Sequence, residues 1–119
     1  MLNNMLIQTI LDNKTNIEYK CIIGKNAQEN WNLINSSDEL DLWFHLEDNP
    51  SPHIFLKTNN LSKNKISKNV LKACAVYCKQ HSKLKSNNNV SIIYTEIKNI
   101  KKTNIVSSVI SSNTKKIII

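Results

Sequence analysis

Most of the side chains that could do chemistry lie in one short stretch, DLWFHLEDNPSPHIFLKT, which runs from Asp41 to Thr58. The stretch contains two of the three histidines, one of the two tryptophans, both prolines and three of the nine acidic residues. Imidazoles beside a carboxylate are suited to binding a metal ion, whereas rings beside lysines are suited to binding nucleic acid. Which chemistry applies depends on the direction in which these side chains point.

Two short apolar runs in this stretch, 42–47 and 53–57, predict the strands of a β-hairpin. Pro50 and Pro52 cannot both lie in a hydrogen-bonded ladder, so they mark the turn between the strands. Side chains alternate between two faces along a strand. One face is wholly apolar and must point to the core: Leu42, Phe44, Leu46, Ile54 and Leu56. The other face, which we predict to be wet or partly covered, carries Trp43, His45, Glu47, His53, Phe55 and Lys57.

A metal site is the first chemical alternative for that mixed face, because Glu47 lies between His45 and His53 on it. Two imidazoles and a carboxylate could hold a metal ion with open positions and support hydrolysis. Neighbouring polar residues on an exposed sheet face explain the same spacing. We therefore expect no bound metal and no cofactor, and a metal-dependent hydrolase is the least favoured function.

Covalent and phosphate-binding chemistry finds little support in the sequence. The serines lie in no G-x-S-x-G context, and Gly24 is the only glycine, which excludes a glycine-rich phosphate loop. Cys74 and Cys78 are four residues apart on a predicted helix and point to its buried side. We therefore expect no catalytic residues and no enzyme.

Charge is divided unevenly along the chain, whose net charge is +7. Residues 1–56 carry three lysines against eight acidic residues, a net charge of −5, and residues 57–119 carry thirteen lysines against Glu96, a net charge of +12. A basic half of this strength is typical of proteins that bind polyanions, although it also fits a solvated surface. Every basic residue is a lysine, which contacts phosphate as a point charge and lacks the forked geometry of arginine. We therefore expect electrostatic binding with modest sequence preference.

Three groups of residues are candidates for contacts with nucleic acid. The mixed face of the hairpin offers rings and a cation at Trp43, His45, His53 and Lys57. The exit of a predicted strand over 90–97 offers Lys98, Lys101 and Lys102. The polar side of a predicted helix over 67–83 offers a second basic patch at Lys68, Lys72, Lys79 and Lys83. Burial of Trp43 under another element and simple solvation of the helical lysines are the alternative interpretations.

The remaining pattern predicts a single α+β domain that spans residues 1–119. Apolar runs over 6–11 and 17–23 predict two strands, and 26–35 predicts a short helix with Asn26 as its N-cap and Glu29 in the capping-box position. We expect Ser67 to cap the longer helix, whose apolar stripe contains Val70, Leu71, Cys74, Ala75, Tyr77, Cys78 and His81. Residues 107–113 and 115–119 predict a final pair of short strands that form a terminal hairpin.

The cysteines and the hydropathy of the sequence indicate in which cellular compartment the protein is expected. The three cysteines form neither a disulfide framework nor a CxxC motif, which favours a reducing, cytoplasmic environment. The first fourteen residues lack the basic region and the unbroken apolar run of a signal peptide. No apolar stretch approaches the length of a membrane span, so we expect no membrane partner.

Three motifs occur in the order, and at about the spacing, found in the NFACT-R domain: GKNAQEN, DLWFHLEDNPSPHIFL and VSIIYTEIKNIKK. The sequence therefore resembles the RNA-binding domain of the NFACT family, which includes ribosome-quality-control factors. The matches span positions 24–102. The residues that match the family pattern are Gly24, Asn26, Glu29, Asn30, Asp41, Trp43, His45, Asp48, Pro50, His53, Tyr94, Thr95, Lys98, Lys101 and Lys102.

The resemblance implies binding of tRNA or of the ribosome, in translation or ribosome quality control and without catalysis. The chain resembles the short, stand-alone members of the family. It departs from the family pattern at the turn, where Ser51 replaces a glycine, and after Lys102, where Thr103 and Asn104 replace a proline and a glycine. The alternative function is a protein-interaction adaptor whose basic half docks an acidic partner.

Overall fold

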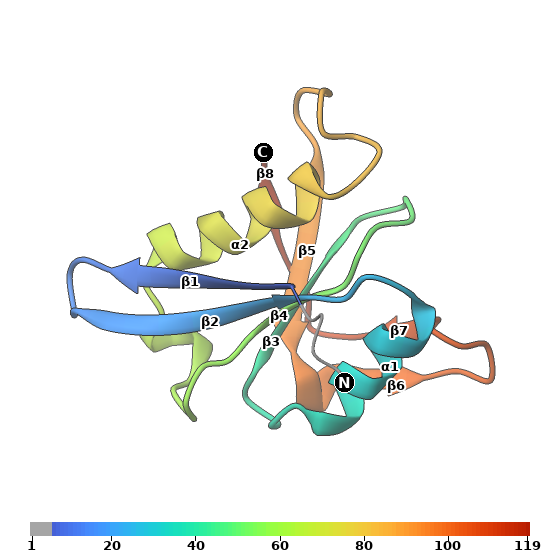
Figure 1. Cartoon of the computed structure of the whole chain (residues 1–119), viewed down its shortest axis with the longest axis horizontal. Helices are drawn as coiled ribbons and strands as arrows, with labels where there is room; N and C mark the ends of the chain where they lie inside the picture. Colours follow the sequence, from blue (N-terminus) through green and yellow to red (C-terminus); the bar gives the residue numbers. More distant parts are fainter. Residues whose placement is uncertain (1–5) are drawn as a thin grey trace.

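A six-stranded antiparallel sheet forms the centre of the computed structural model, which describes residues 6–119. The strand order in this sheet is β1-β2-β4-β3-β5-β8, and β6 and β7 form a separate two-stranded sheet (Figure 1). The helices are α1 (Ala27–Ser36) and α2 (Lys68–Gln80). The strands are β1 (Leu6–Asp12), β2 (Ile17–Ile23), β3 (Leu42–Leu46), β4 (Ile54–Leu56), β5 (Ser91–Glu96), β6 (Ile100–Lys102), β7 (Val109–Ser111) and β8 (Lys115–Ile118). The predicted α+β class is confirmed.

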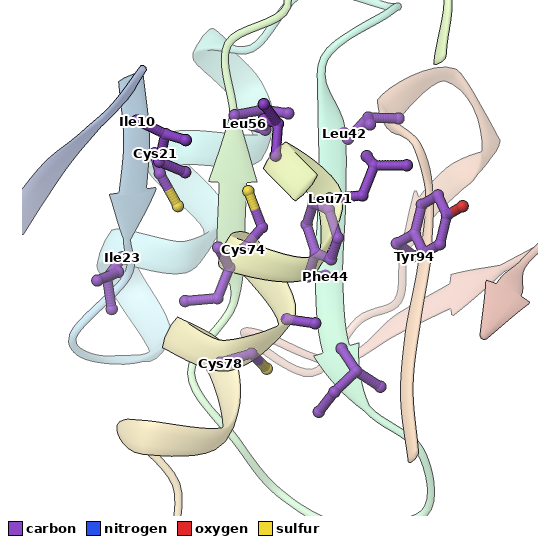
Figure 2. Close-up of a cluster of buried hydrophobic side chains, with 14 of the residues drawn as sticks. Ile10, Cys21, Ile23, Leu42, Phe44, Leu56, Leu71, Cys74, Cys78 and Tyr94 are labelled. Atoms are coloured by element: carbon purple, nitrogen blue, oxygen red, sulfur yellow. The ribbon is translucent and has the colours of Figure 1, made fainter. Parts of the chain in front are cut away.

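One face of the six-stranded sheet packs against α2 and forms an apolar core (Figure 2). The predicted hairpin forms in the expected register, with Leu42 opposite Leu56 and Phe44 opposite Ile54. Phe44 stacks on Tyr94 of β5, with ring centroids 5.2 Å apart. The five side chains assigned to the core by strand alternation are all between 0% and 1% exposed, which confirms that assignment: Leu42, Phe44, Leu46, Ile54 and Leu56.

The three cysteines lie in this core as free thiols, at Cys21 on β2 and at Cys74 and Cys78 on α2 (Figure 2). All three are 0% exposed. Burial raises the pKa of the Cys78 thiol to about 12 and raises the pKa of Cys74 well above its ordinary value. Thiols in such an environment are poor nucleophiles, so the expectation that the helical cysteines point to the core is confirmed.

The opposite face of the sheet is covered by α1 and by the β6–β7 hairpin (Figure 1). Trp43 and Phe55 point from β3 and β4 into a second cluster, which also includes Leu33 and Ile34 of α1. Ile100 of β6 and Val109 of β7, together with other partly buried side chains, pack against this cluster. The face that we predicted to be wet or partly covered is therefore largely enclosed, and the alternative interpretation of Trp43 is the correct one.

The last two strands form as predicted but do not pair with each other. β7 pairs with β6, whereas β8 pairs with β5 and extends the main sheet. The predicted terminal hairpin is therefore wrong. The physical reason is that the two strands bury their apolar side chains in different cores, Val109 in the second cluster and Ile117 in the core under α2.

Only one of the two α-helices is capped at its N-terminus by a side chain as predicted. Asn26 Oδ1 accepts from the Glu29 backbone N–H over 2.9 Å, and Glu29 Oε1 accepts in return from the Lys25 backbone N–H over 2.8 Å. Ser67 occupies the N-cap position of α2 but makes no capping bond. Its hydroxyl instead donates to Asp12 Oδ2 over 2.6 Å, and this bond is the main reason why the pKa of Asp12 lies below its ordinary value.

The longer helix also ends earlier than predicted, at Gln80, and His81 is exposed rather than part of the buried stripe. Within residues 6–119, neither helix has the length and apolar character needed to cross a bilayer.

Candidate nucleic-acid interface

Two of the rings predicted to contact nucleic acid lie inside the molecule. Trp43 and His53 are each 2% exposed, because α1 and the β6–β7 hairpin cover the side of the sheet to which they point. Neither ring presents an open face on which a base could stack, which corrects the expectation of an exposed stacking surface. His45 is the member of this group that reaches the surface, where its side chain is half-buried.

A chain of hydrogen bonds joins the buried rings to the layer that covers them. The Trp43 indole N–H donates to His53 Nδ1 over 3.0 Å, and His53 Nε2 lies 3.3 Å from Ser107 Oγ. Asn30 of α1 donates from Nδ2 to the same Ser107 oxygen over 3.0 Å. An indole nitrogen can only donate, so Nδ1 of a neutral His53 is the acceptor and Nε2 carries its proton. We refer to Trp43, His53, Ser107 and Asn30 as the buried network.

Gly24 makes room for this network. A Cβ atom at position 24 would lie 1.8 Å from Asn30 Oδ1, which is far inside contact distance. The Gly24 backbone N–H also donates to the His53 carbonyl oxygen over 2.9 Å. The GKNAQEN motif therefore has a structural function: its first residue gives space to its last, and the last residue reaches Ser107.

Burial sets the charge of both histidines. Desolvation is the main cause that lowers the pKa of His53 to about 3, and the nearby His45 adds to the effect. Desolvation also lowers the pKa of His45, opposed in part by the hydrogen bond that its Nδ1 makes to the Leu46 carbonyl oxygen over 2.7 Å. Both rings are therefore neutral at pH 7, and the positive charge of any interface must come from lysines.

The residues considered as metal ligands are not brought together as a metal site. Glu47 forms an ion pair with Lys116 of β8, with 2.9 Å between Oε1 and Nζ. Both ring nitrogens of His53 have partners in the buried network. Within residues 6–119, no group of three histidine, cysteine, aspartate or glutamate residues is placed to hold a metal ion.

Lys57 is bound to a buried carboxylate at the end of β4. Its Nζ lies 2.6 Å from Asp41 Oδ2, and Asp41 is 0% exposed. The same carboxylate accepts from the backbone N–H groups of Thr58 and Asp38, over 3.0 Å and 2.9 Å. Lys57 therefore neutralises the domain's own buried charge, and Asp41, which matches the family pattern, fixes the chain around the hairpin.

Lys98 shares a carboxylate with another lysine. Glu96 Oε1 lies 3.4 Å from Lys63 Nζ and 3.9 Å from Lys98 Nζ. The Lys98 side chain is 49% exposed, so the longer of the two pairs is open to solvent and is weak. These two lysines and Glu96 leave a net positive charge at the exit of β5.

The β6–β7 hairpin carries the least neutralised of the predicted lysines. Lys101 is exposed and lies opposite Ile110 in the hairpin register, and no ion pair is made by it within residues 6–119. Lys102 donates to Asn35 Oδ1 over 2.5 Å and holds its Nζ 4.9 Å from the centre of the Trp31 ring. Both partners of Lys102 are uncharged, so the hairpin presents two cations without a compensating carboxylate.

Three of the lysines predicted on the longer helix, Lys68, Lys72 and Lys79, are on α2, which lies on the other side of the six-stranded sheet (Figure 1). Lys83 follows the end of this helix. Lys79 donates to the Ile119 carbonyl oxygen over 3.2 Å. The other three are exposed: Lys68, Lys72 and Lys83. The structure therefore places the lysines of the β6–β7 hairpin and those of α2 on opposite sides of the six-stranded sheet.

Sequence reasoning missed Ser107 as a functional position and gave Asn30 no role beyond its match to the family motif. Asn30 carried a usable signal, because it closes the GKNAQEN motif at about the end of the first turn of the predicted helix, close to the chain that enters this helix. Ser107 carried none, because it is one of several serines in a polar loop. Its role depends on the long-range contact to residues 30 and 53.

The molecule is thus a small basic α+β domain in which a lysine-bearing hairpin is anchored over buried rings. The model of the NFACT protein RNA binding domain matches residues 7–113, and the chain belongs to this family. The resemblance seen in the three motifs is therefore confirmed, and the chain is an RNA-binding domain by family. The roles of the individual lysines and rings stay predictions.

The chain is also similar to curated proteins from animals and from Dictyostelium discoideum. The chain is 37% identical over 90 residues to coiled-coil domain-containing protein 25 of Bos taurus, an alignment that covers 71% of this chain and 42% of the relative. It is 36% identical over 88 residues to the Dictyostelium discoideum homologue, covering 72% and 43%. The chain thus spans less than half the length of the curated relatives that it matches.

The fold is also found in the C-terminal part of the fibronectin/fibrinogen-binding protein from Streptococcus suis. That structure superposes with a TM-score of 0.80 at 23% identity and covers 99% of this chain and 46% of the other. At this identity the likeness concerns the fold.

Proposed function

We propose that this domain binds tRNA or ribosomal RNA in the cytoplasm, without catalysis, and acts in translation or ribosome quality control. The observation that carries the proposal is the β6–β7 hairpin, on which Lys101 and Lys102 project without a compensating carboxylate in a domain of an RNA-binding family. The buried network holds this hairpin to the sheet, so the cations have a fixed position.

The binding mode follows from the chemistry of lysine. Ammonium groups contact phosphates as point charges and read no base edges by themselves. Each phosphate contact releases a counterion, so the logarithm of the affinity falls linearly with the logarithm of the salt concentration. We expect this linear fall in a titration with tRNA, and a flat salt response at measurable affinity would rule out phosphate contacts.

The two lysine groups can be separated by mutation. We expect K98A/K101A/K102A to lower the salt slope by up to about three units and to weaken tRNA binding far more than K68A/K72A/K79A/K83A does. Lys98 should contribute least of the three, because Glu96 lies beside it. Both variants should fold, since exposed lysines rarely carry stability, and circular dichroism is the control. Loss of binding in the helical variant with binding retained in the hairpin variant would place the interface on α2.

A protein partner is the second candidate, and one feature of the hairpin favours it. Ile105, Val106 and Ile110 are 67%, 45% and 64% exposed, which places apolar side chains beside Lys101. Such a surface could dock an acidic protein with an apolar centre. The same salt titration with an acidic protein in place of tRNA tests this candidate, and binding of tRNA at much lower concentration would reject it.

A further inference from the structure

A cavity of about 440 Å³ lies where the β3–β4 turn meets the β6–β7 hairpin. Its apolar lining comes from Trp43, Leu46, Ile93 and Val109. Its polar lining includes His45 and Asp48 on one side and Ser107 on the other. The volume is at the small end of the range for ligand pockets, which run from roughly 300 to 1,000 Å³. A pocket of this size and mixed character can take one flat ring system but not a folded chain segment.

His45 supplies this cavity with a hydrogen-bond acceptor. Its ring lies nearly parallel to the Trp43 ring, with centroids 5.5 Å apart and planes 12° from parallel, so one of its faces is packed. Nδ1 donates to the Leu46 carbonyl oxygen, which leaves Nε2 of the neutral ring with a bare lone pair. No partner for Nε2 is found within residues 6–119, and the side chain is only half-buried.

Ser107 supplies a donor on the opposite wall. Its oxygen accepts from Asn30 Nδ2 and from the protonated Nε2 of His53, and these two bonds use both lone pairs. Its hydroxyl hydrogen has no acceptor among the described residues. The backbone at Ser107 has φ of 72°, and that at Asp48 on the other lip has φ of 64°. Both residues are therefore in the left-handed region of the backbone map, which turns the chain at each lip of the cavity.

The charge of the lining decides which part of a nucleic acid could enter. Among the residues that line the cavity, Asp48 is the one with a full charge, and lysine does not occur there. A phosphate would be repelled by this carboxylate. A nucleobase is flat and uncharged and carries donors and acceptors along one edge, and exocyclic amino groups donate readily to carboxylates.

We propose that this cavity receives one unpaired nucleobase of the bound RNA, with its edge between His45 Nε2, the Ser107 hydroxyl and the Asp48 carboxylate. This inference rests on the proposed RNA binding and adds to it a site for a base. The hairpin that forms one wall also carries Lys101 and Lys102, so the phosphates on either side of the base would remain outside the cavity and near these cations. Bases with an amino group, such as cytosine, should be preferred over uracil because of Asp48.

The test uses single-stranded hexanucleotides that share the same phosphates. The probes are C6, U6 and a C6 in which every sugar lacks its base, each titrated against the protein at one low salt concentration. Removing the bases should weaken binding roughly tenfold or more, since a bound base contributes on that scale. C6 should bind several-fold tighter than U6. Equal binding of C6 and the abasic probe would overturn the base site while leaving phosphate binding intact, whereas absence of binding to all three would overturn both.

A variant pair assigns the effect to the cavity. His45→Asn removes the Nε2 acceptor while an amide nitrogen remains near the Leu46 carbonyl, and it should bring C6 to within about threefold of the abasic probe. His81→Asn is the matched control, because His81 is exposed at the end of α2 and should leave the ratio unchanged. Thermal melting checks that both variants fold. If His45→Asn folds and keeps the full C6 preference, the base does not bind at His45 and the proposal is wrong.

Discussion

The two faces of the six-stranded sheet are covered by different kinds of structure. The face under α2 is filled by apolar side chains in regular alternation and contains the three buried thiols. The face under α1 and the β6–β7 hairpin combines apolar contacts with the buried network of Trp43, His53, Ser107 and Asn30. The first face can be made by any apolar set of the right volume, whereas the second needs particular donors and acceptors at particular places.

This difference shows what several of the family-motif residues do in the structure. Gly24, Asn30, Trp43 and His53 all match the family pattern, and all four lie at the second face. The side chains of Asn30, Trp43 and His53 are buried, and Gly24 leaves the space that Asn30 needs, so these residues act by fixing the hairpin that carries Lys101 and Lys102. Mutations on the two faces should therefore differ in kind: those on the first face lower stability, and those on the second lower both stability and RNA affinity.

The largest effect is expected on the first face, from Phe44→Ala. Phe44 is 0% exposed and stacks on Tyr94, so its removal leaves a cavity that its neighbours cannot fill. The free energy of unfolding should fall by about 3–5 kcal/mol in urea denaturation. The molecules that remain folded should bind tRNA with the affinity of the parent, because α2 and the hairpin lie on opposite sides. Weaker binding by fully folded protein would break the comparison between the faces.

The next effect concerns the pair formed by Trp43 and His53. His53→Ala leaves the Trp43 indole N–H buried without an acceptor, and we expect a loss of about 2–3 kcal/mol. Trp43→Phe removes the donor and should cost less. The double variant should be more stable than the sum of the two losses predicts, by about 1 kcal/mol. Strict additivity would show that the hydrogen bond between the rings contributes nothing.

Measuring RNA binding of His53→Ala and Phe44→Ala side by side sharpens the comparison between the two faces. His53→Ala breaks the link to Ser107 and frees one end of the β6–β7 hairpin, so tRNA affinity should fall even where circular dichroism shows a folded protein. Phe44→Ala, which is more destabilising, should show the smaller loss of affinity under conditions in which both are folded.

Gly24→Ala should have an intermediate effect. The new methyl group would overlap Asn30 Oδ1, and the asparagine must then turn away from Ser107. Overpacking of this kind costs about 1–3 kcal/mol. In G24A/N30A the clash is absent, so the alanine at position 24 should cost less than it does with Asn30 present. A G24A cost that is the same in both backgrounds would show that the strain lies in the backbone at Gly24 and not at Asn30.

Strand alternation predicts the first face well because it is a local property. The pattern around Phe44 defines which side chains are buried, and no information about other elements is needed. The same pattern placed Trp43 and His53 together on one face, but it could not show what covers them. The covering hairpin comes from residues 100–111, and its short apolar runs indicate strands without indicating their partners.

Side-chain bonds between distant positions were also beyond prediction. Asn26 caps α1 as expected, since the cap lies within three residues of its partner. Ser67 sits at the corresponding position of α2 but bonds to Asp12, 55 residues earlier in the chain. Ser107 likewise joins partners 54 and 77 residues away. Sequence spacing carries no signal for contacts that depend on the packing of one layer on another.

The smallest effect is expected from mild acid, and it should distinguish the two faces within one molecule. The pKa of His53 is about 3 in the folded state and about 6.5 in an unfolded chain, so the unfolded state binds more protons below pH 6.5. Stability from this group is therefore complete above pH 6.5 and is lost as the pH falls from there toward 3. At pH 5.5 the loss should be about 1.4 kcal/mol, and His45, whose pKa is also lowered, acts in the same direction.

This acid effect should appear first where the histidines are. The groups in contact with His53 are Trp43, His45, Phe55 and Ser107, and none of them is an anion. Asp48 lines the same cavity, but it is exposed to solvent and forms no ion pair with the ring. Protonation therefore favours any state in which the β6–β7 hairpin has lifted from the sheet and water reaches the ring. Amide hydrogen exchange between pH 7.5 and 5.5, corrected for the intrinsic pH dependence of exchange, should show protection falling in β6, β7 and α1 before it falls in α2. His53→Asn, which cannot titrate, should flatten the response, and an equal loss of protection in α2 would mean that acid unfolds the domain as one unit.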